Sequence, residues 1–167
     1  MAEDREKFKE LCERIGEPTL PSLIANDMAE GKKAAADIGY PVLVRPSFVL
    51  GGRAMQIVGN TKALRYYLHN AVEINTNSPV LVDKYIMGRE TEVDAICDGT
   101  DVFIPGIMEH IERTGIHSGD SIAVYPAQDI DSNIEDRIVS TTRSLCEGLN
   151  ATGIGNVQYI VKDGEIY

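Results

Sequence analysis

The chain has 167 residues, 43% hydrophobic and 25% charged, which is enough for a buried core in one ordinary domain or two small lobes. A net charge of −10 argues against a nucleic-acid-binding surface, which needs clustered Lys and Arg. No apolar stretch reaches the roughly 20 residues of a membrane span, and the charged start of the chain is unlike a secretory signal. We therefore expect a cytoplasmic protein whose cysteines, Cys12, Cys97 and Cys146, are buried free thiols.

Helical periodicity and capping signals predict the first part of the chain. Residues 4–15 place Phe8, Leu11 and Ile15 on one helical face. Asp27 with Glu30 has the form of a capping box. These signals predict helices over residues 4–15, from Asp27 to Gly39 and from a cap at Thr61, with strands at residues 41–44, 54–58 and 80–85.

From Glu90 onward the pattern changes to strict alternation. Residues 90–98 put Thr91 and Val93 on one face and the carboxylates of Glu90, Glu92 and Asp94 on the other. Further signals predict strands over residues 102–110, 118–124 and 156–161, a helix from a capping box of Ser132 with Glu135, and a turn at Asp163-Gly164. We expect a second lobe with an antiparallel sheet backed by a helix, joined to the first by a hinge at residues 85–89.

Arg45 and a glycine loop form the most informative segment. Arg45 ends an apolar strand, and Gly51-Gly52 closes the loop that follows. Glycines let backbone N–H groups approach phosphate oxygens, and an arginine supplies matching donors. The segment has no Gly-Lys-Ser/Thr, so it is not a P-loop. The alternatives are a simple hairpin turn and, for Arg45, a structural ion pair.

Three further groups are candidates for chemistry. The carboxylate face of residues 90–94 is either solvated or positioned to accept from ribose hydroxyls. Asn156 and Gln158 share a strand face, where amides either satisfy the core or offer oxygen ligands to Mg²⁺. The Gly-rich loop at residues 114–120 carries His117, which is either incidental or close to a ligand. His69 and His110 lack metal-ligand spacing with it.

Taken together, these segments resemble an ATP-grasp domain, and specifically the large chain of carbamoyl phosphate synthetases. The resemblance covers essentially the whole chain. It is carried by residues 4–8, 45–47, 51–55, 92–99, 106–112, 115–121 and 156–158. The Gly-Gly-Arg-Ala-Met form of residues 51–55 resembles the second, carbamate-phosphorylating half of that chain.

The resemblance implies an α+β ATP-grasp fold of two lobes, with an antiparallel sheet in the second. The first lobe spans residues 1–88, including the leading helix, and the second spans residues 89–167 and is C-terminally incomplete. It implies catalytic roles for Arg45, which stabilises charge on the phosphoryl group, and for His117 at the acyl phosphate. It implies nucleotide binding by Arg5, Arg45, Gly51, Gly52, Lys84, Ile86, Glu90, Gly115, Ile116, His117, Ser118 and Gln158, with Gln158 also at the metal ions.

The activity implied is ATP-dependent phosphorylation of carbamate to carbamoyl phosphate, with Mg²⁺ or Mn²⁺, in arginine or pyrimidine biosynthesis. The implied partners are ATP, carbamate or bicarbonate, a glutaminase small subunit and the remaining large-chain domains, with no nucleic acid and no membrane. In that family a glutamate and an asparagine that bind the metal follow the last hairpin, beyond Tyr167. We therefore expect an ATP-binding fragment that is inactive alone. The alternatives are a nucleotide-binding module, an inert folded fragment, or another ATP-grasp carboxylate-amine ligase such as a biotin carboxylase relative.

Overall fold

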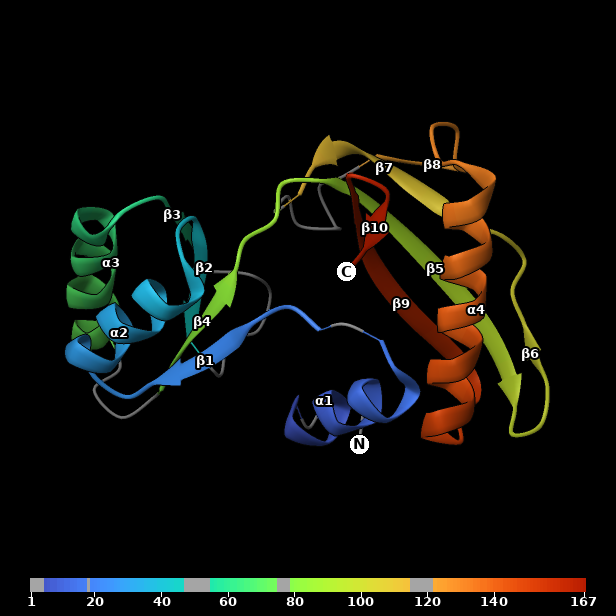
Figure 1. Ribbon diagram of the computed structural model, residues 1–167, viewed down its shortest axis with the longest axis horizontal. Helices are drawn as coiled ribbons and strands as arrows, with labels where there is room; N and C mark the ends of the chain where they lie inside the picture. Colours follow the sequence, from blue (N-terminus) through green and yellow to red (C-terminus); the bar gives the residue numbers. More distant parts are fainter. Residues whose placement is uncertain (1–4, 18, 47–54, 75–78, 115–121) are drawn as a thin grey trace. The chain divides into compact units, whose positions relative to one another are not determined.

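The computed structural model describes residues 5–17, 19–46, 55–74, 79–114 and 122–167 (Figure 1). The chain divides into two compact units. One comprises Leu20–Ile86 and is called the 20–86 unit below. The other combines Met1–Thr19 with Met87–Tyr167 and is called the 87–167 unit. The described helices include none long and apolar enough to cross a membrane.

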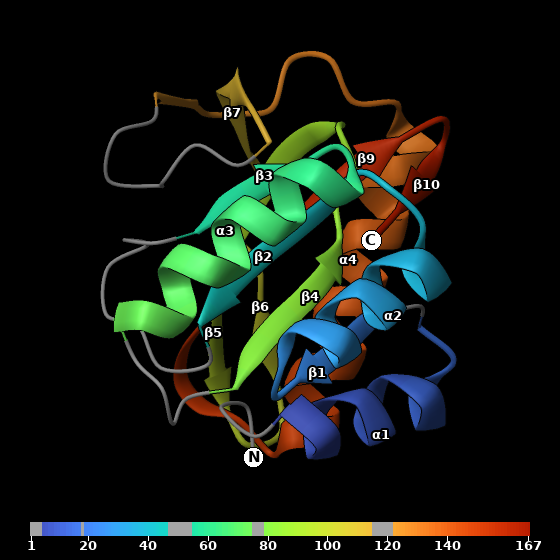
Figure 2. The same ribbon diagram turned by 90° about the vertical axis from the view of Figure 1, so that its left-hand side faces the viewer.

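The 20–86 unit is a four-stranded antiparallel sheet in the order β1-β4-β2-β3, with two helices. Its elements are β1 (Ser22–Ala25), α2 (Met28–Ile38), β2 (Val42–Pro46), β3 (Gln56–Val58), α3 (Thr61–Ile74) and β4 (Val80–Lys84). Figure 2 shows α2 and α3 on one face of this sheet. Val42, Val44 and Val82 on that face are fully buried with Ala35 and Leu64 of the helices.

Side-chain caps define where these helices begin. The Asp27 carboxylate accepts from the backbone N–H groups of Ala29 and Glu30, which confirms the predicted start of α2. Thr61 was predicted to cap α3, and this prediction was wrong. The Asn60 side chain accepts from the N–H of Ala63 instead, because Asn60 lies just before the first helical residue. The strand β1 was not predicted, because only one of its four residues is buried.

The 87–167 unit contains a six-stranded antiparallel sheet in the order β10-β9-β5-β7-β8, with β6 paired to β5. Its strands are β5 (Arg89–Asp98), β6 (Val102–Phe103), β7 (Met108–Arg113), β8 (Ala123–Val124), β9 (Thr152–Lys162) and β10 (Glu165–Ile166). A single strand over residues 102–110 was predicted, and it is interrupted. Pro105 lacks a backbone N–H, and the Tyr125 ring packs against Gly106 where a Cβ would lie.

Two helices complete this unit. The buried side chains of α4 (Ser132–Leu149), among them Ile134 and Ile138, pack with Val93 and Tyr159 of the sheet. The predicted capping box at Ser132 is wrong, because the residue at the N-cap is Asp131, and its side chain makes no capping bond. All three cysteines are buried and free, as predicted.

The leading helix α1 (Arg5–Ile15) packs on α4. Leu11 and Cys12 of α1 form a buried cluster with Leu145 of α4. The resemblance implies that this helix belongs to the first lobe, with a boundary after residue 88. In the structure it belongs to the same compact unit as α4, and the chain passes between the units after Thr19 and after Ile86.

Candidate functional site

Arg45 lies on β2, on the sheet face opposite the buried Val42 and Val44. Its Nε donates to Asp83 Oδ2 at 2.9 Å. Asp83 on β4 is only 11% exposed and also accepts from the hydroxyl of Ser22. The register places Arg45 opposite Leu81, so Asp83 is its diagonal neighbour. The ion pair fixes one edge of the guanidinium, and the Arg45 side chain as a whole remains 37% exposed.

Lys84 and Ile86 end the 20–86 unit. The Lys84 ammonium donates to the backbone carbonyl of Gly39 at 2.8 Å. That carbonyl lies at the C-terminus of α2, where the helix dipole favours a positive charge. Lys84 therefore links the C-terminus of α2 to β4. This structural contact was not predicted from the sequence.

Glu90, Glu92 and Asp94 share the face of β5 opposite α4, as the alternation predicted. Glu90 is half-buried and stands opposite Ile160 of β9. Glu92 accepts from the Asn156 amide at 2.6 Å, and Asp94 accepts from the same amide at 2.9 Å. The Gln158 amide lies 3.5 Å from Glu92.

His110 of β7 is buried against this network, with Nε2 2.9 Å from the Glu92 carboxylate. Burial of Glu92 alone would raise the pKa of its carboxyl. The hydrogen bonds from His110, Asn156 and Gln158 outweigh burial and hold that pKa below its usual value. The Glu92 carboxylate therefore holds the side chains of its hydrogen-bond partners His110, Asn156 and Gln158 in place. From the sequence, His110 is predicted only as a residue of the strand over residues 102–110. His110 lies two residues after Met108, which stands opposite Glu92, and no sequence signal specifies this pairing of β7 with β5.

A metal site was predicted at Gln158. Within the described ranges, no group of three or more His, Cys, Asp or Glu side chains is arranged to hold a metal ion. The Gln158 amide nitrogen faces Glu92. An amide ligand such as Gln158 is not part of such a group, so the contact of Gln158 with metal ions stays a prediction.

Several predicted residues lie outside the described part of the chain. They are Gly51, Gly52, Gly115, Ile116, His117 and Ser118, together with the side chain of Arg5. The structure therefore describes Arg45, Lys84, Ile86, Glu90 and Gln158 among the predicted nucleotide residues. Arg45, Lys84 and Ile86 belong to the 20–86 unit, and Glu90 and Gln158 belong to the 87–167 unit.

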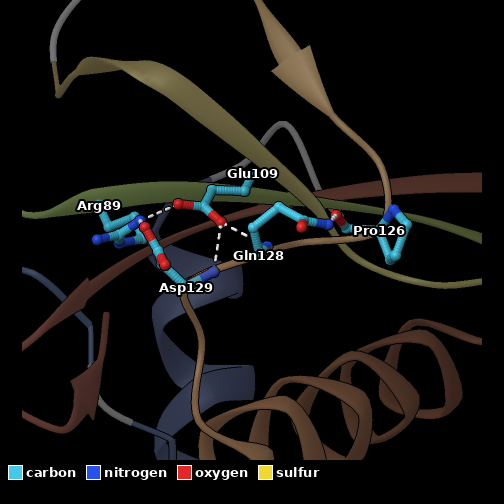
Figure 3. Close-up of polar contacts among 5 residues, drawn as sticks. All are labelled: Arg89, Glu109, Pro126, Gln128 and Asp129. Carbon is cyan, nitrogen blue, oxygen red and sulfur yellow. Dashed lines mark hydrogen bonds and ion pairs between the residues drawn. The ribbon is translucent and has the colours of Figure 1, made fainter.

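A second polar cluster, on the α4 side of the sheet, was not predicted (Figure 3). Glu109 of β7 is buried and accepts from the backbone N–H groups of Gln128 and Asp129 at 2.8 and 3.0 Å. Arg89 donates to Glu109 and, at 3.1 Å, to the Asp129 carboxylate. The Glu109 side chain therefore ties the start of β5 to the segment before α4.

The chain has the fold of ATP-grasp enzymes, and several solved structures share it. A biotin carboxylase–β,γ-ATP complex from Campylobacter jejuni superimposes with a TM-score of 0.82 at 26% identity over 99% of this chain and 39% of that one. VanG D-Ala:D-Ser ligase from Enterococcus faecalis gives 0.77 at 19% identity, covering 98% and 50%. N5-carboxyaminoimidazole synthase from Aspergillus clavatus, in complex with ADP, gives 0.77 at 18% identity, covering 98% and 42%.

The chain matches the family described as carbamoyl-phosphate synthase L chain, ATP binding domain, over residues 4–167, and it belongs to that family. It is therefore an ATP-binding domain of the ATP-grasp ligase class. The chain spans half or less of the length of the solved structures named above.

Proposed function

We propose that this chain is the ATP-binding part of an enzyme that phosphorylates carbamate with ATP, giving carbamoyl phosphate and ADP. The observation that carries this proposal is the family match over residues 4–167. The Gly-Gly-Arg-Ala-Met sequence of residues 51–55 favours the carbamate-phosphorylating half of the enzyme. A glutaminase subunit and further large-chain domains belong to the same proposal.

Arg45 is the described residue to which we assign contact with the phosphates. A guanidinium carries five N–H donors in a rigid plane. Asp83 takes the donor on Nε and so sets the orientation of that plane on the sheet. We assign the donors on the Nη atoms to phosphate oxygens, where they stabilise the negative charge of the transferring phosphoryl group.

Calorimetric titration of the full chain with MgATP tests the assignment of Arg45. Arg45→Ala is expected to weaken binding by about tenfold or more, because it removes charge-assisted hydrogen bonds. Asp83→Asn is expected to retain most of the affinity, since the guanidinium remains. Arg137→Ala is the matched control, because Arg137 is similarly exposed and also pairs with a carboxylate, that of Glu165. A purely structural ion pair is the alternative, and under it Arg45→Ala and Asp83→Asn would lower stability alike without changing ATP affinity.

Turnover tests the chemistry separately from binding. Because the reaction is reversible in principle, carbamoyl phosphate with MgADP is expected to yield ATP when the chain is active. Binding of MgATP without turnover is expected both for an ATP-binding fragment that is inactive alone and for a nucleotide-binding module, whereas neither binding nor turnover would favour an inert folded fragment. The similarity to a biotin carboxylase favours one second candidate, a carboxylase. ADP release that depends on bicarbonate and biotin, without carbamate, would support that candidate instead.

A further inference from the structure

The β5–β7 ladder is irregular at Glu90. Arg89 pairs with Arg113 and Thr91 pairs with Glu109, so one residue of β5, Glu90, stands opposite residues 110–112 of β7. On the other side, β5 pairs with β9 in unbroken register from Arg89 to Asp98. A bulge of this kind removes regular ladder support on one side and redirects side chains, and bulges are frequent beside active sites. On the β7 side, the backbone around Glu90 is therefore held by contacts other than a regular ladder.

Two side chains from β7 and its end supply such contacts on either side of the bulge. The Thr114 hydroxyl accepts from the Gly88 N–H at 3.0 Å and donates to the Gly88 carbonyl at 2.7 Å. Glu109 holds the Arg89 guanidinium and the backbone N–H groups before α4 (Figure 3). The two residues before Glu90 are therefore held by side chains of β7 and its end: Gly88 by Thr114, and Arg89 by Glu109.

Gly88 is also packed closely against β9. A Cβ at this position would lie 2.6 Å from the Val161 carbonyl oxygen and 2.6 Å from Ile160. Close packing against β9 therefore fixes the path of the backbone at the start of β5. Because successive side chains of a strand point to opposite faces, fixing Arg89 toward the α4 side directs Glu90 to the face that carries Glu92.

We propose that Thr114 and Glu109 are positioning residues that hold Glu90 in place to accept hydrogen bonds from the ribose hydroxyl groups of a bound nucleoside triphosphate. This inference rests on the proposed function. Neither residue touches the nucleotide. Each acts by replacing the ladder support that the bulge removes at Glu90.

The test compares the affinities of the full chain for MgATP and for Mg-2′,3′-dideoxy-ATP, which lacks both hydroxyls. The ratio of the two dissociation constants is the ribose preference. Wild type is expected to prefer ATP by about tenfold or more, as for hydrogen bonds to a charged acceptor. Glu90→Ala is expected to bring the ratio close to one. Thr114→Val and Glu109→Gln are expected to lower it severalfold while leaving the affinity for the dideoxy analogue within about twofold.

Two controls separate positioning from general loss of structure. Thr114→Ser keeps the hydroxyl and is expected to restore the wild-type ratio. Thr141→Val removes a comparably buried hydroxyl, which donates to Glu17 at 2.8 Å, and is expected to leave the ratio unchanged. The double variant Thr114→Val with Glu90→Ala is expected to match Glu90→Ala alone.

Each of the other possible outcomes contradicts a specific part of the proposal. If wild type binds neither nucleotide, the proposed function fails and this inference fails with it. If Glu90→Ala keeps the preference for ATP, nucleotide binding stands but Glu90 is not the acceptor and the inference is wrong. If Glu90→Ala abolishes the preference while Thr114→Val and Glu109→Gln preserve it, or weaken both nucleotides equally, positioning by these residues is rejected.

Discussion

Glu109 is a buried carboxylate whose hydrogen-bond donors all come from within the described part of the protein. Its side chain is 4% exposed, and it accepts from two backbone N–H groups and from Arg89. Burial alone would raise the pKa of this carboxyl, but these donors outweigh burial and lower that pKa below its usual value. A group whose pKa is lower in the folded state stabilises the protein above its unfolded pKa. That stability is lost as the pH falls through the folded pKa.

Glu109→Gln is therefore expected to lower the free energy of unfolding by about 1–3 kcal/mol at pH 7, because an amide cannot accept from all three donors. Below about pH 4.3, the ordinary value for a glutamate, the difference from wild type is expected to shrink. Urea unfolding across pH 3–7 measures both effects. Glu165→Gln, which removes an exposed carboxylate paired with Arg137, is the control and is expected to change stability by less than about 1 kcal/mol. A constant difference across the pH range would contradict the assignment.

Single residues also show what could and could not be predicted from the sequence. Arg45 in an apolar strand was recognised as a charge that needs a partner. Its partner, Asp83, is 38 residues away and was not identified, because only the sheet register makes them neighbours. Glu92 and Asp94 were correctly placed on one face from the alternation alone. The contact of His110 with Glu92 depends on the pairing of β7 with β5, which the sequence does not specify.

Helix starts provide a matched pair of experiments at the scale of elements. Asp27 caps α2 with two hydrogen bonds, whereas Asp131 stands at the N-cap of α4 without a side-chain capping bond. Asp27→Ala is expected to lower the free energy of unfolding by about 1 kcal/mol. Asp131→Ala loses only its favourable interaction with the helix dipole and is expected to have a smaller effect. Denaturant midpoints of both variants check this, and equal losses would show that the capping bonds at Asp27 add nothing.

Elements were predicted from sequence where one local signal dominated. The helices α1, α2 and α4 and the alternation of β5 were recognised, and so was the turn before β10. Predictions failed where neighbouring residues compete for a role. Asn60 rather than Thr61 caps α3, and Asp131 rather than Ser132 is the N-cap of α4. The strand β1 escaped because it pairs with β4, far along the chain, and buries little of its own surface.

At the scale of the whole molecule, the two units have separate cores. The buried cluster around Val42, Leu64 and Val82 draws only on the 20–86 unit. The clusters around Val93, Ile138 and Leu11 draw only on the 87–167 unit. The periodicity of α1 did not predict that this helix packs in the core of the 87–167 unit. An apolar helix face indicates burial but does not name the surface that covers it.

Separate cores predict that a core cavity destabilises one unit more than the other. Leu64→Ala is expected to remove about 2–5 kcal/mol from the stability of the 20–86 unit, because Leu64 is fully buried. Amide hydrogen exchange should then increase in α2, α3 and β1 to β4 more than in α4 and β5. Ile138→Ala, also at a fully buried position, is the matched variant with the reverse pattern expected. If Leu64→Ala accelerates exchange equally in both units, the chain unfolds as one cooperative body and the separation of cores has no energetic meaning.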